Sequence, residues 1–173
     1  RSSEAHVELP VRVNWGGGWT DTPPYCMEKG GTVVNAAIRL KGILPVQVTV
    51  RRIEALKIEV ASEDVGAFGE LRTLEEVLDC HNPYDAFALH KAALIACGVV
   101  PFENDGSVTL EEILRRLGGG LFVSTQVIGI PKGSGLGTSS ILAGACVKAI
   151  FEIMGEHISE EQLYEIVLCM EQI

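Results

Sequence analysis

A glycine-rich stretch, "PKGSGLGTSS" at residues 131–140, carries the residue types of a phosphate-binding loop. It follows a β-prone segment at 121–130 and precedes an apolar pattern of helical period that begins at Ile141. Glycines let the backbone turn so that its N–H groups converge, and a helix N-terminus adds unpaired N–H groups and a positive dipole end. We therefore predict that this loop cradles phosphate, with Ser139 or a neighbouring hydroxyl near a Mg²⁺ ion that bridges the phosphates.

The spacing of these glycines excludes two familiar nucleotide motifs. The glycines form GxGxG, so neither the Walker A pattern GxxxxGK[ST] nor the dinucleotide pattern GxGxxG is present. A plain strand-to-helix connection is the alternative interpretation, because glycine is common in tight turns. Three glycines followed by Thr-Ser-Ser exceed what a turn requires, and this favours a phosphate site.

A second polar stretch, "RVNWGGGWTDTPP" at residues 12–24, combines Arg12, Asn14 and Asp21 with three glycines and both tryptophans of the chain. Small-molecule sites place a few fixed polar groups on an apolar floor, and carboxylate and amide groups beside an aromatic face would suit a sugar. The alternative is an irregular surface loop in which Asp21 caps a turn.

The bulk composition limits the class of protein. The chain has 173 residues, 47% of them hydrophobic, which suits one packed domain or one domain with part of another. A net charge of −9 with scattered Lys and Arg argues against nucleic-acid binding, and no apolar run is long enough to span a membrane. Five irregularly spaced cysteines without CxxC indicate free thiols in a reducing cytosol. We therefore expect a cytoplasmic protein without nucleic-acid or membrane partners.

Strands and helices are mixed along the chain without regular βαβ alternation, which predicts an α+β fold. Alternating valines at residues 46–50 predict a half-buried strand, and the segment 57–60 is expected to pair with it. Residues 14–24 contain too much Gly and Pro for a helix or a regular strand, so a loop is expected there. Two capping boxes are expected at helix starts, formed by Thr109 with Glu112 and by Ser159 with Gln162.

Three segments together resemble one family, the GHMP sugar kinases. They are "PVRVNWGGGWTDTPPYC", "GGTVVNAAI" and "IPKGSGLGTSSILAGA", and the resemblance extends over residues 7–173. The glycine loop resembles the whole superfamily, whereas "GGWTDTPPYC" is similar to its L-fucokinase branch. The resemblance implies that residues 1–173 form an N-terminal ATP-binding domain similar to domain 2 of ribosomal protein S5, cut before a ferredoxin-like C-terminal domain. It also implies Mg²⁺-dependent transfer of the γ-phosphate of ATP to the anomeric hydroxyl of L-fucose.

The resemblance further implies roles for individual residues. Those outside the glycine loop are Arg12 beside the reacting hydroxyl, Asn14, Gly17 and Asp21 at the sugar, and Glu171, with Ser139 of the loop, at Mg²⁺. Those expected to hold ATP are Lys132, Gly133, Ser134, Gly135, Leu136, Gly137, Thr138, Ser139 and Ser140. An isolated glutamate is usually an ordinary surface residue. Glu171, however, lies four residues after Val167 at the edge of an apolar helical stripe, so its carboxylate is expected to point inward.

Two features depart from the family pattern. Residue 14 is Asn where relatives often have Asp, and the catalytic aspartate, the general base, is expected beyond Ile173. We therefore expect a piece of a longer protein that is inactive alone, with a nucleotidyltransferase domain as a candidate fusion partner. The alternatives are another GHMP sugar 1-kinase, such as a heptose phosphate kinase, and a catalytically silent module that senses sugar or nucleotide.

Overall fold

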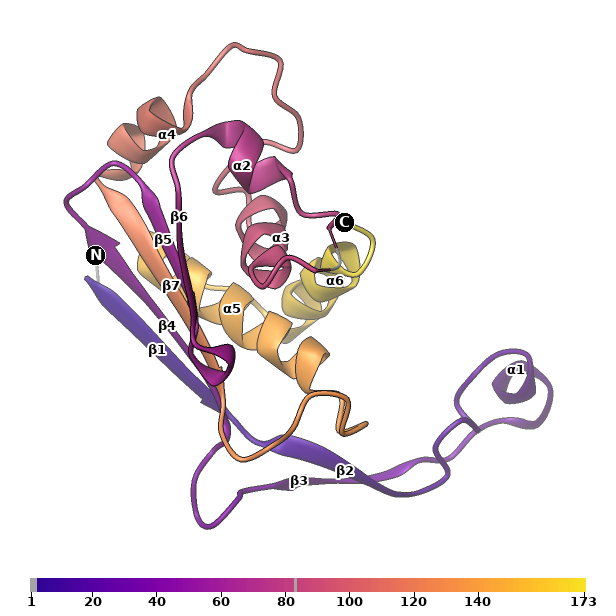
Figure 1. The fold of residues 1–173 in the computed structure, drawn as a ribbon. Helices are drawn as coiled ribbons and strands as arrows, with labels where there is room; N and C mark the ends of the chain where they lie inside the picture. Colours follow the sequence, from indigo (N-terminus) through magenta and orange to yellow (C-terminus); the bar gives the residue numbers. More distant parts are fainter. Residues whose placement is uncertain (1–2, 83) are drawn as a thin grey trace.

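A five-stranded sheet forms one layer of the protein (Figure 1). The computed structural model describes residues 3–82 and 84–173. The strands, in their order across the sheet, are β1 (Glu4–Leu9), β4 (Val46–Ile53), β7 (Gly120–Val127), β5 (Ile58–Ser62) and β6 (Ala67–Leu71). Neighbouring strands are antiparallel except β5 and β7, which run parallel. A short 3₁₀ turn, η1 (Glu63–Val65), joins β5 to β6.

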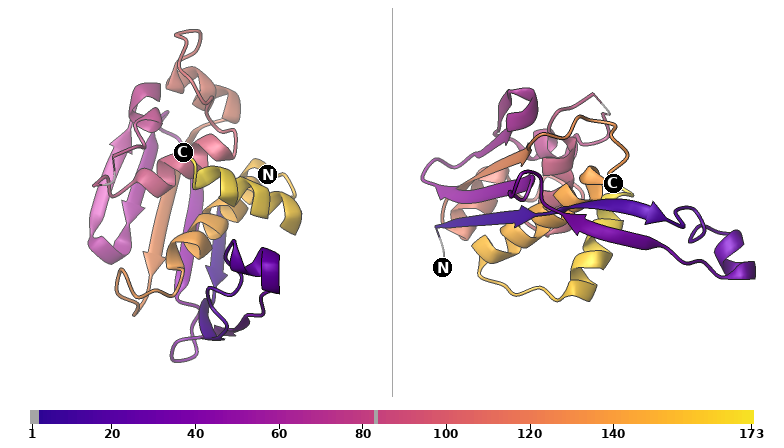
Figure 2. Two further views of the ribbon diagram at one scale, coloured as in Figure 1. Left: turned by 90° about the vertical axis from the view of Figure 1, so that its right-hand side faces the viewer. Right: turned by 90° about the horizontal axis from the view of Figure 1, so that it is seen from below.

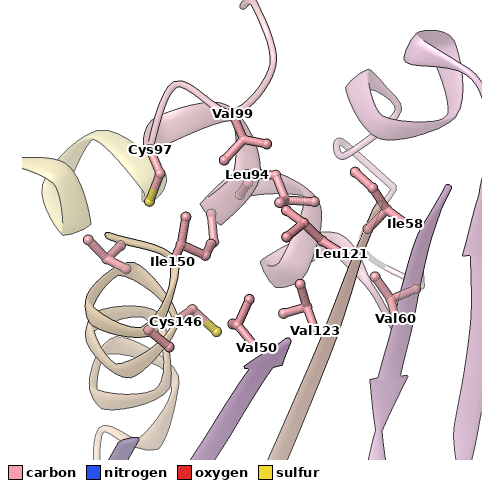
Figure 3. Packing of buried hydrophobic residues seen from close by; sticks show 14 of the residues in the cluster. Val50, Ile58, Val60, Leu94, Cys97, Val99, Leu121, Val123, Cys146 and Ile150 are labelled. Carbon is pink, nitrogen blue, oxygen red and sulfur yellow. The ribbon is translucent and has the colours of Figure 1, made fainter. Parts of the chain in front are cut away.

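Helices cover one face of this sheet (Figures 1 and 2). They are α2 (Leu74–Leu78), α3 (Ala88–Ala96), α4 (Leu110–Leu117), α5 (Thr138–Met154) and α6 (Glu160–Met170). The valines of β4 alternate with polar residues as expected, and Val46, Val48 and Val50 are fully buried. In Figure 3, valines of β4, β5 and β7 point toward Ile150 of α5 and Leu94 of α3. Burying each such side chain contributes about 1.5–3 kcal/mol, so this packing fixes α5 firmly on the sheet.

A separate hairpin leaves the sheet near the start of α5 and projects away from the helices (Figures 1 and 2). It consists of β2 (Val11–Gly16) and β3 (Val34–Ile38), paired antiparallel with a register shift between Asn14 and Gly16. The one-turn helix α1 (Tyr25–Lys29) lies at its outer end. Pro10 separates β1 from β2, because proline cannot donate to a ladder and breaks the strand there.

Several local predictions are confirmed and two are wrong. The capping boxes at the starts of α4 and α6 form as expected, and Thr73 with Glu76 forms a third one on α2. The segment near residue 58 does form a strand, β5, but β7 lies between it and β4. This pairing was missed because β7 begins only at Gly120, far along the chain from β4 and β5, and the local pattern carries no information on it. Residues 14–16 continue β2 and are not loop, because pairing with β3 overrides the glycine content.

The predicted apolar stripe of α6 is only partly covered. Met170 is buried, whereas Leu163, Ile166 and Val167 are half-buried. All five cysteines are free thiols, as the sequence predicted. Within the described ranges, no helix has the length and hydropathy needed to cross a membrane.

Candidate functional site

The glycine loop connects β7 to α5 and keeps its backbone open to solvent. Gly133, Gly135 and Gly137 have φ of 76°, 73° and 64°, in the left-handed region that favours glycine. A Cβ added at Gly133 or Gly135 would meet no atom within 4 Å, so space for a ligand lies directly against the backbone. Gly137 is the N-cap of α5 and supplies no side-chain hydrogen bond. The first N–H groups of α5 are therefore not satisfied by the N-cap side chain, which suits an anion.

The start of α5 lies against the end of α6. Ser140, in the first turn of α5, donates a hydrogen bond from Oγ to Oε1 of Glu171 over 3.2 Å. Glu171 is the C-cap residue of α6 and is exposed. The sequence predicted that its carboxylate points inward, but the side chain lies at the surface and faces the N-terminus of α5. The two helices pack closely at Gly144, where an added Cβ would make an ordinary van der Waals contact with Val167 at 4.0 Å. The sequence predicted the apolar helical pattern after the glycine loop and the start of α6 at Ser159, but not the contact between α5 and the end of α6.

A cavity of about 230 Å³ opens beside these hydroxyls, between α3, α5 and α6. Its lining includes Ser139, Ser140 and Glu171 together with Cys80 and Leu89. The sequence gave no sign that α3 borders this cavity, because the α3 residues that line it are plain apolar ones. Burial raises the pKa of the Cys80 thiol, which disfavours the reactive thiolate form.

A second, larger cleft of about 580 Å³ lies on the other side of Ser140, between α5 and α6. Arg12 lines it together with Gly137, Ser140 and Glu171. The Arg12 Nη2 atom approaches the glycine loop so closely that a Cβ added at Gly137 would lie 4.0 Å from it. Three predicted site elements far apart in sequence, the strand β2, the glycine loop and the end of α6, therefore meet at one cleft.

The residues present at this point fit a Mg²⁺–phosphate site only in part. Glu171 supplies one carboxylate and Ser139 and Ser140 supply hydroxyls, which are the oxygen ligands that Mg²⁺ takes. Among the described residues, no group of three or more His, Cys, Asp or Glu could hold a metal ion. Protein-bound Mg²⁺ commonly uses one or two carboxylates and completes its shell with phosphate oxygens and water. The donor set thus suits a metal that arrives with a nucleotide.

The predicted sugar residues Asn14, Gly17 and Asp21 lie on the hairpin and do not line the cleft. Asn14 Oδ1 accepts the Gly16 N–H at 3.0 Å, so this amide shapes the turn. A Cβ at Gly17 would lie 1.8 Å from the Thr32 carbonyl oxygen, which makes glycine necessary there. Asp21 is exposed, and Lys132 at the start of the glycine loop is exposed as well.

The sequence and the structure both match known kinases. Residues 107–173 match the family model described as the GHMP kinases N terminal domain. The fold is similar to a D-glycero-D-manno-heptose 1-phosphate kinase from Bacteroides thetaiotaomicron, with a TM-score of 0.64, 20% identity, and coverage of 98% of this chain and 47% of that one. It is also similar to a Lactococcus lactis galactokinase solved with galactose, with a TM-score of 0.67, 20% identity, and coverage of 99% and 38%. Residues 107–173 of this α+β chain are therefore similar to the N-terminal domain of GHMP kinases, and the fold of the chain is similar to that of solved kinases.

Two curated relatives are considerably more similar in sequence. One is the L-fucokinase/L-fucose-1-P guanylyltransferase of Bacteroides fragilis, 41% identical over 165 residues and covering 95% of this chain. The other is the bifunctional fucokinase/GDP-fucose pyrophosphorylase of Arabidopsis thaliana, 39% identical over 170 residues and covering 96% of this chain. The matched region is 17% and 15% of these two relatives, so the chain spans about one sixth of their length.

Proposed function

We propose that residues 1–173 are the N-terminal ATP-binding domain of a longer kinase that phosphorylates the anomeric hydroxyl of L-fucose. The observation that carries the proposal is identity of 39–41% over almost the whole chain with two proteins that are both named as fucokinases. Both names also include a nucleotidyl-transfer activity, which supports a fused nucleotidyltransferase domain in the full-length protein. The cleft at the start of α5 supplies groups for phosphoryl transfer.

In the proposed site, the glycine loop from Lys132 to Ser140 holds the triphosphate of ATP. Its left-handed glycines keep side chains off the backbone, and the N–H groups at the start of α5 face the anion. Ser139 and Glu171 hold Mg²⁺, which when bound neutralises charge on the phosphates. Ser140 orients the Glu171 carboxylate through its hydrogen bond.

Arg12 takes the position next to the reacting hydroxyl. Its guanidinium lines the same cleft as Gly137 and Glu171, so it can face charge that develops on the transferred phosphoryl group. Positioning and charge neutralisation account for most of the catalysis in phosphoryl transfer, and these residues supply part of both. Asn14, Gly17 and Asp21 form the sugar side of the site on the hairpin.

A sugar panel tests this function. The full-length protein is assayed with ATP and Mg²⁺ on L-fucose, D-arabinose, D-galactose and heptose 7-phosphate. We expect L-fucose to rank first by kcat/KM, with phosphate on the anomeric oxygen. A clear preference for a heptose phosphate would make that sugar the substrate and contradict the fucokinase proposal. Absence of transfer to any sugar would favour a sensing module.

A further inference from the structure

Helix α3 carries a buried lysine next to residues that line the cavity of about 230 Å³. The Lys91 side chain is only 9% exposed, and lysine is almost never buried unless it is paired. Its Nζ atom donates to Oδ2 of Asp85 at 2.6 Å and to the carbonyl oxygen of Asp79 at 3.0 Å. None of these three residues lines the cavity or the larger cleft, so the buried charge does not contact a ligand there directly.

The two partners of Lys91 lie at the two ends of the connection between α2 and α3. Asp79 is the C-cap residue of α2, and Asp85 precedes α3. Asp85 also accepts the N–H of Phe87, the N-cap residue of α3, through Oδ1 at 2.9 Å. Burial raises the pKa of Asp85, but the hydrogen bonds from Lys91 and Phe87 outweigh burial and lower the pKa below its ordinary value. One ammonium group therefore ties both ends of this connection to α3.

The connection and the first turn of α3 form one wall of the cavity. Cys80 comes from the connection, and Ala88 and Leu89 come from α3. The proposed Mg²⁺ ligands Ser139 and Glu171 line the same cavity from α5 and from the end of α6. Figure 1 shows the connection passing beside the end of α6. A shift of this wall would therefore change the shape of the space next to the proposed metal ligands.

This cavity lies on the nucleotide side of the proposed site. Ser140 borders both hollows, and Arg12 lines only the larger cleft, where the sugar hydroxyl is proposed to react. The cavity instead has an apolar lining on its α3 side. An apolar wall beside a phosphate loop suits the uncharged part of ATP, its nucleoside.

We propose that Lys91 is a positioning residue that holds the α3 wall of this cavity in place for the nucleoside of ATP. This inference rests on the proposed function. Lys91 acts through Asp79 and Asp85, which fix the connection that carries Cys80. Displacement of a positioning group by about 1 Å can lower a rate about 100-fold, so loss of this pair should weaken the use of ATP.

Three variants of the full-length protein test this role. Lys91→Met alone would leave the Asp85 carboxylate buried without its counter-charge, which is strongly destabilising. Lys91→Met is therefore combined with Asp85→Asn, because removing both charges of a buried pair is often neutral for stability. Lys91→Arg keeps the cation. Leu94→Ala is the matched control, because Leu94 is a fully buried residue of α3 that does not line the cavity, and its truncation destabilises the core.

We expect the double variant to raise KM for ATP about 10-fold or more while KM for L-fucose stays near the wild-type value. Lys91→Arg should retain most of the wild-type affinity for ATP. Leu94→Ala should lower the Tm without changing KM for ATP, measured at a temperature at which it is folded. Unchanged KM for ATP in the double variant would overturn the inference. An equal rise in Leu94→Ala would also overturn it, because the effect would then follow stability.

A measurement on the wild-type protein does not depend on how the variants fold. Addition of ATP with Mg²⁺ should slow amide hydrogen exchange at residues 84–91 of the α3 wall, and unchanged exchange there would overturn the inference. Calorimetry with ATP separates this inference from the proposed function. If the wild-type protein binds ATP but does not phosphorylate L-fucose, the proposed function fails and the ATP affinity of the double variant still decides the role of Lys91. If the wild-type protein does not bind ATP, both fail.

Discussion

Ser140 and Glu171 join two helix ends of opposite dipole across 3.2 Å, although they are 31 residues apart in the chain. The Glu171 carboxylate lies at the C-terminus of its own helix, where the dipole disfavours negative charge. The N-terminus of α5 faces it and offsets that cost. The contact holds the Glu171 carboxylate beside the end of the glycine loop where α5 begins, and the first prediction depends on this arrangement.

Replacing the Glu171 carboxylate by a neutral amide should weaken Mg²⁺ binding. We expect Glu171→Gln to raise the Mg²⁺ concentration needed for half-maximal kinase activity, and Ser139→Ala to do the same as a proposed ligand. Ser140→Ala should have a smaller effect, about 10-fold, because Ser140 acts through Glu171. Mg²⁺ titrations of the full-length protein at saturating ATP measure these effects. A larger effect in Ser140→Ala than in Ser139→Ala would make Ser140 the Mg²⁺ ligand and contradict the role proposed for Ser139.

A side chain in the glycine loop should block nucleotide. Gly135→Val places atoms in the open space against the backbone and strains a residue with φ of 73°. Gly98→Val is the matched control, because Gly98 has φ of 71° with equally open surroundings at the end of α3. Both should lose about 1–3 kcal/mol of unfolding free energy. Only Gly135→Val should lose ATP binding in calorimetry, and undiminished binding would make the loop a simple turn.

Loss of the Asp21 carboxylate should affect the sugar and not the nucleotide. A charge-assisted hydrogen bond contributes about 1.5–3 kcal/mol, so Asp21→Ala should lower kcat/KM for L-fucose about 10- to 100-fold with KM for ATP little changed. Glu28→Ala, at an exposed position of α1 on the same hairpin, is the control. If Asp21→Ala lowers the Tm but does not lower kcat/KM for L-fucose selectively, Asp21 caps a turn and does not bind the sugar.

The buried histidine beneath the sheet should make stability depend on pH. His90 lies within hydrogen-bonding distance of the Ala61 carbonyl and the Thr125 hydroxyl through Nε2, while its buried Nδ1 has no partner among the described residues. Burial lowers its pKa below the usual 6.5, although the bond to Ala61 and the charges of Asp85 and Asp64 act in the opposite direction. The unfolded chain therefore takes up a proton first as the pH falls.

Its contribution to stability is complete above about pH 6.5 and is lost progressively as the pH falls through the lowered value. We expect the Tm to drop over this range, and His90→Gln to flatten the dependence while lowering the Tm at neutral pH. An identical pH profile in wild type and His90→Gln would assign the effect to other groups, such as the Lys91–Asp85 ion pair at 2.6 Å.

Local chemistry determined much of this protein from the sequence alone. Capping boxes and the alternating valines of β4 depend on residues within a few positions of each other, and both formed as predicted. The glycine loop was also predictable, because the left-handed backbone at Gly133, Gly135 and Gly137 favours glycine over every other residue type. The resemblance to the GHMP sugar kinases rested on this loop together with two segments nearer the N-terminus.

Only the tertiary structure decided which of these parts meet. The parallel pairing of β7 with β5, the contact of Ser140 with Glu171, and the approach of Arg12 to Gly137 join residues tens to more than a hundred positions apart. Such contacts follow from burying the apolar face of α5 on the sheet and packing α6 beside it, a free energy shared by many side chains. No short stretch of sequence contains that sum, so the sequence could propose residues for the site but not show where they meet.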